Sequence, residues 1–74
     1  MTAEAWIESF ASASGAAAPS EPEIDKLLRL AAVAAHSSER IAAPLACWIA
    51  GREGIDLDDA IAMAEGIGPR QDGD

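Results

Sequence analysis

Cysteine and aromatic residues are scarce in this 74-residue sequence, and each scarcity limits how its fold can be stabilised. A single cysteine, Cys47, makes an intramolecular disulfide impossible. Aromatic residues make up 4% of the chain, and much of the remaining apolar content is alanine, so the core is expected to be small. In chains below about 80 residues such a core rarely contributes more than roughly 3–5 kcal/mol, and a metal or a partner usually adds to it. No metal-ligating cluster and no cofactor motif is visible, which leaves self-association as the expected addition.

Positive charge and long apolar runs are also lacking. Five basic residues stand against 13 acidic ones, for a formal net charge of −8. This balance argues against nucleic acid and against an anionic membrane surface as partners, because both attract basic patches. No apolar run approaches the roughly 20 residues of a membrane span. Glu4 and Glu8 stand where a signal peptide would be basic, so a cytoplasmic location is expected.

The apolar residues recur with helical spacing, and no stretch alternates with period two. The sequence therefore predicts an all-α fold, a compact bundle of four short helices. Thr2, Ser20 and Asp56 are candidate N-caps, Ser20 with Glu23 fits a capping box, and Pro44 suits the first turn of a third helix. The predicted helices cover about residues 3–14, 21–36, 43–52 and 57–65.

The predicted domain organisation is a single helical domain over residues 1–67, followed by a disordered acidic tail over 68–74. Gly66 is expected to end the last helix in the left-handed conformation. The tail has no apolar residue to bury, which is why it is expected to be frayed.

Helical spacing also predicts which faces are buried. In the second helix the predicted face comprises Ile24, Leu27, Leu28, Ala31 and Ala35, and it is widened by Leu30 and Ala34. Asp25 and Arg29 are expected to form an ion pair on the opposite side, where Val33 hints at further cover. In the third helix the predicted face comprises Ile41, Leu45, Trp48 and Ile49. Trp6 and Trp48 are interpreted as core residues in preference to partner anchors.

Residues 36–40 form a polar corner between two apolar segments. Arg40 could present a fork to a carboxylate or phosphate, and His36 could donate or accept a hydrogen bond beside it. The alternative is architectural. Histidine is favoured at a helix C-terminus, and Glu39 with Arg40 could tie the corner to the bundle, in which case Glu39→Ala should lower the melting temperature clearly. The candidate binding residues are His36, Glu39, Arg40 and Trp48.

No catalytic residue is predicted. Cys47 could act as a nucleophile only if His36 approached it, and no third orienting group is evident, so a small buried thiol is the favoured interpretation. Asp56, Asp58 and Asp59 are better explained by helix capping than by calcium, because the glycine of a calcium loop is absent.

A family resemblance adds a context. It is carried by Leu27-Leu28, Ala31, Ala35-His36, Glu39-Arg40, Ala42-Ala43-Pro44-Leu45 and Gly51. Over roughly residues 4–66 the chain resembles an uncharacterised small helical actinobacterial domain, found alone or fused C-terminally to molybdenum cofactor guanylyltransferase. The resemblance implies a link to molybdopterin-guanine dinucleotide biosynthesis. It also implies that nucleotidyltransferase activity would reside in the separate domain, whose Gly-rich loop is absent here.

The expected function is a non-catalytic helical interaction or accessory module, linked to molybdenum cofactor biosynthesis. Its partner is expected to be a second copy of itself, as a homodimer, or a cofactor-maturation protein. The alternative is a small anionic ligand- or nucleotide-binding domain centred on the His36-Glu39-Arg40 corner.

Overall fold

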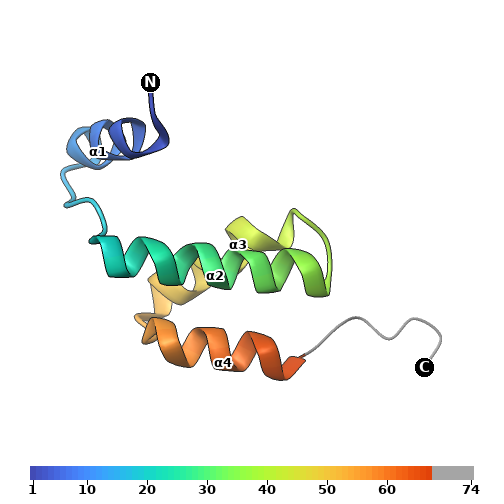
Figure 1. Ribbon diagram of the computed structural model, residues 1–74. Helices are drawn as coiled ribbons and strands as arrows, with labels where there is room; N and C mark the ends of the chain where they lie inside the picture. Colours follow the sequence, from blue (N-terminus) through green and yellow to red (C-terminus); the bar gives the residue numbers. More distant parts are fainter. Residues whose placement is uncertain (68–74) are drawn as a thin grey trace.

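The computed structural model describes residues 1–67 and confirms the predicted all-α fold of four short helices (Figure 1). They are α1 (Ala3–Ser14), α2 (Glu21–Ser37), α3 (Ala42–Glu53) and α4 (Leu57–Ile67). Residues 1–67 contain no strand. The predicted tail, residues 68–74, lies outside the described residues.

The N-terminal ends of the helices follow the capping chemistry predicted from the sequence. The Thr2 side chain accepts a first-turn hydrogen bond in α1. At the start of α2, the Glu23 N–H donates to Ser20 Oγ at 3.3 Å, and the Ser20 N–H donates to Glu23 Oε1 at 2.8 Å. This reciprocal pair is the predicted capping box. The Asp59 N–H donates to Asp56 Oδ2 at 3.1 Å, which caps α4.

The C-terminal ends of α1 and α3 use glycine. Gly15 and Gly54 adopt left-handed conformations, with φ of 80° and 65°. After α3 the Ile55 N–H donates to the Ala50 carbonyl at 3.0 Å, and this turn directs Ile55 against the core. Gly66 was predicted to end the last helix, but it lies inside α4, which continues to Ile67. A glycine in a final turn costs only about 1 kcal/mol relative to alanine, so its position alone does not fix the helix end.

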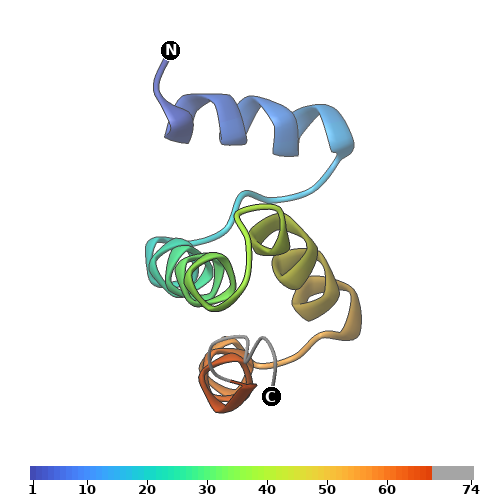
Figure 2. The same ribbon diagram turned by 90° about the vertical axis from the view of Figure 1, so that its right-hand side faces the viewer.

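Helix α2 is central, and both α3 and α4 pack along it (Figures 1 and 2). The chain breaks after Ser37, as predicted, and α3 returns in roughly the opposite direction, inclined to α2. Helix α4 then runs in the same direction as α2. Pro44 occupies the first turn of α3, although the helix begins slightly earlier than predicted, at Ala42. Helix α1 stands apart from these three helices and is joined to them through residues 15–20.

The core is small and lies where α2, α3 and α4 meet. Its buried residues are Leu30, Ala50, Ala60 and Ile61. Leu30 is 3% exposed, whereas Leu28, which was predicted to be in the buried face, is 64% exposed. The prediction was wrong because two helices flank α2, so its buried arc is centred between them on Leu30 and not on the most continuous apolar stripe.

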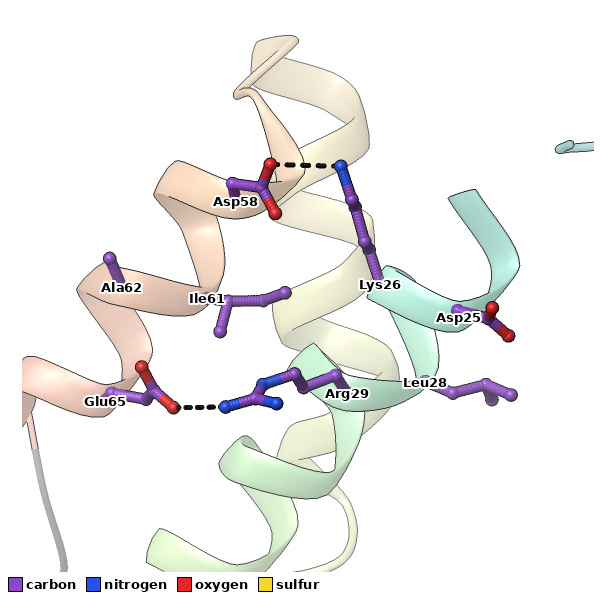
Figure 3. A pocket seen from close by; sticks show the side chains of 8 residues that line it. All are labelled: Asp25, Lys26, Leu28, Arg29, Asp58, Ile61, Ala62 and Glu65. Atoms are coloured by element: carbon purple, nitrogen blue, oxygen red, sulfur yellow. Dashed lines mark hydrogen bonds and ion pairs between the residues drawn. The ribbon is translucent and has the colours of Figure 1, made fainter. Parts of the chain in front are cut away.

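Helix α4 packs on the Arg29 side of α2, which was predicted to lie opposite the apolar face. Lys26 Nζ lies 3.0 Å from Asp58 Oδ2, and Arg29 lies 3.1 Å from Glu65 Oε2 (Figure 3). Arg29 therefore pairs across the helices, and the predicted partner, Asp25, is directed away from α4. Val33, one turn after Arg29, is half-buried.

Candidate interaction surface on α3 and α1

Helix α3 directs its small residues into the molecule and its large apolar residues outward. Ala50 is 3% exposed and Cys47 is half-buried against the core. The opposite side carries four large apolar residues that are 51–69% exposed: Ile41, Leu45, Trp48 and Ile49. We call these four residues the α3 apolar face. The sequence predicted this face to be the core side of the helix and Trp48 to be a core residue, and both predictions were wrong.

The side chains on the inward side of α3 are small because α3 approaches α2 closely. The Cys47 Sγ donates to the Leu27 backbone carbonyl at 3.7 Å, a contact that requires the two helices to be close together. Alanine and cysteine on the inward side permit this approach, whereas leucine or tryptophan there would force the helices apart. At 3.6 residues per turn, the large residues then necessarily lie on the opposite side.

Trp48 is accompanied on the surface by Arg52. The guanidinium carbon of Arg52 lies 4.7 Å from the centroid of the Trp48 ring, within the range of a cation–π contact. Arg52 Nε also lies 3.0 Å from Glu53 Oε2. Arg52 was not identified from the sequence, although its spacing of four residues from Trp48 could have revealed it.

Helix α1 carries a second exposed apolar face. Its residues are Trp6, Ile7 and Phe10, which share one side of the helix through their spacing of three and four residues; we call them the α1 apolar face. The rings of Trp6 and Phe10 stack with centroids 5.4 Å apart and an interplanar angle of 11°. Both rings are more than half exposed, so the interpretation of Trp6 as a core residue was also wrong.

The predicted polar corner lies between α2 and α3, with all three of its site residues exposed. His36 is in the last turn of α2, and the Glu39 and Arg40 carbonyls accept hydrogen bonds from the first N–H groups of α3. Within residues 1–67 their side chains make no hydrogen bond or ion pair, and Trp48 contacts Arg52 and not the corner. The expected tie between corner and bundle is therefore absent from the described residues.

The start of α3 adds no free donors to this corner. The N–H groups of Ala42 and Ala43 already donate to the Glu39 and Arg40 carbonyls, at 2.9 and 3.1 Å. Pro44 has no N–H, and Ile41 provides no side-chain cap. An anion at the corner would thus depend on the exposed side chains alone, which leaves the anion-binding hypothesis a prediction.

Cys47 and His36 are too far apart to act together. Cys47 contacts Leu27, and Leu27 lies about 13 Å from His36 along the axis of α2, at roughly 1.5 Å per residue. Burial also raises the pKa of the Cys47 thiol, which disfavours the reactive thiolate. This thiol therefore has the properties of a packing residue.

The α2–α4 groove is open and lined by paired charges (Figure 3). Ile61 lies between the Lys26–Asp58 and Arg29–Glu65 pairs. The hydrogen bond from Lys26 to Asp58, together with the Asp58 charge, raises the pKa of Lys26. Because both cations already face carboxylates, the groove offers an anionic ligand no unpaired positive charge within residues 1–67.

Two further observations concern metal binding and membrane-spanning helices. Among residues 1–67, no group of three or more histidine, cysteine, aspartate or glutamate residues could hold a metal ion. In the same part of the chain, no helix has both the length and the apolar character needed to cross a bilayer.

Comparison with known proteins gives one match. Residues 1–67 match the model of a family described as a domain of unknown function, DUF6457. No curated protein matches the chain, and no solved structure does. The family description names no activity and makes no reference to molybdenum cofactor guanylyltransferase. Since the match spans all four helices, this chain belongs to the DUF6457 family.

Proposed function

We propose that this DUF6457 domain is a non-catalytic helical interaction module that docks on a partner through the α3 apolar face. The observation that supports it best is the orientation of α3, with alanine and cysteine inward and its three largest apolar side chains outward, next to the exposed Ile41 at its N-cap. Single exposed apolar residues are ordinary on protein surfaces, but a contiguous set on one helix face is typical of an interaction site.

The spacing of the face suits helix-mediated recognition. Ile41, Leu45, Trp48 and Ile49 fall at intervals of four, seven and eight residues from the first, the pattern by which an amphipathic helix contacts a groove or another helix. Tryptophan and arginine are enriched among residues that dominate binding energy, and Trp48 with Arg52 supplies both at the C-terminal part of the face.

Energetics support the same proposal. Full burial of a large apolar side chain contributes about 1.5–3 kcal/mol. Because the four side chains are about half exposed, a partner that covers them would contribute on the order of 3–6 kcal/mol before the costs of association. This gain is similar to what the small internal core can supply on its own, roughly 3–5 kcal/mol.

The partner is either a second copy of this chain or a protein of molybdenum cofactor maturation. The support for the second is the resemblance of the His36–Leu45 segment to a domain that also occurs fused to molybdenum cofactor guanylyltransferase. In this role the chain would be an accessory that binds the enzyme, with no guanylyl transfer of its own.

Site-specific photo-crosslinking in cells tests the docking role. A photoreactive phenylalanine analogue in place of Trp48 is expected to give a defined crosslinked product. The same analogue at Met63, which is on α4 and equally exposed at 58% against 59%, is the matched control. Equal crosslinking from both positions would remove the proposal. Products that contain only this chain would retain docking and remove the molybdenum link.

The alternative, a small anionic ligand or nucleotide at the corner, is supported by the exposed side chains of His36 and Arg40. Calorimetric titration with guanine nucleotides and pterins should then show binding that Arg40→Ala abolishes. An equal absence of heat from wild type and variant would remove this alternative.

A further inference from the structure

We infer that the partner covering the α3 apolar face is a second copy of this chain, with α1 of each copy docked on α3 of the other. This inference rests on the proposed docking function and adds the identity of the partner and the helix that it contributes.

The first observation is that helices α1 and α3, within residues 1–67, each present an exposed apolar face. The α1 apolar face and the α3 apolar face each carry a tryptophan that is more than half exposed, and the close helix packing in residues 1–67 is that of α3 and α4 on α2. A reciprocal dimer pairs each face with the other. It therefore covers both with one occupant and needs no additional partner.

The second observation is the area that these faces offer. Aliphatic side chains remove roughly 60–120 Å² of apolar area when buried, and aromatic ones about 150–250 Å². At the observed exposures, the α3 apolar face offers roughly 300 Å² and the α1 apolar face roughly 250 Å².

Stable interfaces bury about 1,200–2,000 Å² in total. Pairing two α3 faces alone would bury about half of the lower value, roughly 600 Å². Including both α1 faces brings the total to roughly 1,100 Å², before any polar rim is added. The area therefore favours an interface that contains α1 as well as α3.

The position of α1 permits such an exchange. It stands away from α2, α3 and α4 and is joined to α2 by residues 15–20, a segment that can extend over roughly 20 Å (Figures 1 and 2). A two-fold axis then generates the same contact twice, α1 to α3 and α3 to α1, which is the closed form expected of a homodimer.

Sedimentation of the purified full chain tests this inference. Wild type is expected to sediment with twice the chain mass of 7.6 kDa. Phe10→Glu and Trp48→Glu should each raise the dimer Kd by at least about 30-fold, the effect of losing a residue that dominates an interface. Met63→Glu, which places the same charge at a similarly exposed apolar position on α4, should leave Kd unchanged. Circular dichroism confirms that each variant keeps its helices.

A mixing experiment distinguishes the reciprocal arrangement from an α3-to-α3 dimer. Ile7→Lys on α1 and Leu45→Glu on α3 should each give monomers when alone. An equimolar mixture should recover a dimer, because the mixed pair has one contact between two unaltered faces. In its other contact, the lysine introduced on α1 of one variant can meet the glutamate introduced on α3 of the other. The mixture therefore regains a contact between an unaltered α1 and an unaltered α3, which neither variant can form with itself.

Three results would overturn the inference. Loss of the dimer with Trp48→Glu but not with Phe10→Glu would indicate pairing of α3 alone. A monomer in which both tryptophans are protected from acrylamide would indicate that α1 covers α3 within one chain. A monomer that still crosslinks to another protein through position 48 would remove the dimer and leave the proposed docking function intact.

Discussion

Individual residues at helix ends determine where this chain starts and stops its helices. The Ser20–Glu23 capping box, the Thr2 and Asp56 caps and Gly15 could all be predicted, because a capping hydrogen bond spans only a few residues of sequence. Gly66 could not be assigned in the same way, because the sequence does not distinguish a glycine in the last turn from one just beyond it.

The capping box predicts a pH dependence. The hydrogen bonds from the Ser20 backbone N–H and, secondarily, from its side chain lower the pKa of Glu23 from its ordinary value of 4.5. A carboxyl group whose pKa is lower in the folded state stabilises the fold above its ordinary pKa and loses that effect as the pH falls through the folded value. Urea unfolding at about pH 6 and pH 3 should show a smaller loss of stability in Glu23→Gln than in wild type. An identical loss in both would assign the acid sensitivity to other carboxylates.

Cys47 predicts a chemical difference between the folded and unfolded chain. Burial raises the pKa of its thiol, and alkylation requires the thiolate. Iodoacetamide near pH 8 should therefore modify the folded chain clearly more slowly than the chain in concentrated urea, with a short cysteine peptide as the control for urea itself. Equal rates would contradict the packing role of this thiol.

At the scale of the helix, the sequence predicted the elements better than their faces. In α2 and α3 the apolar pattern allowed more than one buried side, because both helices carry alanine around much of their circumference. The choice depends on how closely α3 approaches α2 and on where α4 packs, and these are tertiary distances that no local spacing encodes. The error at Leu28 and the error at Trp48 have this common cause.

The orientation of α2 can be tested by a pair of leucine variants. Leu30→Ala removes a core side chain and should lower the free energy of unfolding by about 2–5 kcal/mol, enough to unfold much of the chain. Leu28→Ala removes an exposed one and should change it by less than about 0.5 kcal/mol in the monomeric Trp48→Glu background. Urea titration measures both, and a larger effect at Leu28 would favour the face predicted from the sequence.

The pairing of α2 with α4 predicts a charge-swap result. Arg29→Glu should reduce stability by roughly 0.2–1 kcal/mol, as expected for an exposed ion pair, and adding Glu65→Arg should restore it. Glu39→Ala should change stability by no more than about 0.5 kcal/mol, because its side chain ties no helices together within residues 1–67. Thermal melts of these variants show whether the Arg29–Glu65 pair or the corner at Glu39 stabilises the packing of the helices. A clear loss with Glu39→Ala alone would re-establish the corner as the tie.

For the molecule as a whole, the sequence predicted the main constraint, a thin core in a small acidic chain. The partner expected from that constraint stays a prediction. The sequence also named Trp48 as a candidate binding residue, which stays a prediction, and the structure leaves that side chain exposed on the α3 apolar face. It could not select between that face and the polar corner, because a residue's value for binding depends on exposure, and exposure follows from the packing of the other helices.

Self-association predicts that thermal stability rises with concentration. Because the dimer forms from folded chains, each tenfold increase in concentration stabilises it by about 1.4 kcal/mol, or roughly 0.7 kcal/mol per chain. For a domain of this size that corresponds to a shift in Tm of about 3–6 °C per tenfold. Circular dichroism melts over a hundredfold range should show this slope in wild type and in Met63→Glu, and a flat response in Trp48→Glu. If the wild-type melting temperature is equally flat, the small core of Leu30, Ala50, Ala60 and Ile61 must be sufficient to hold the chain folded by itself.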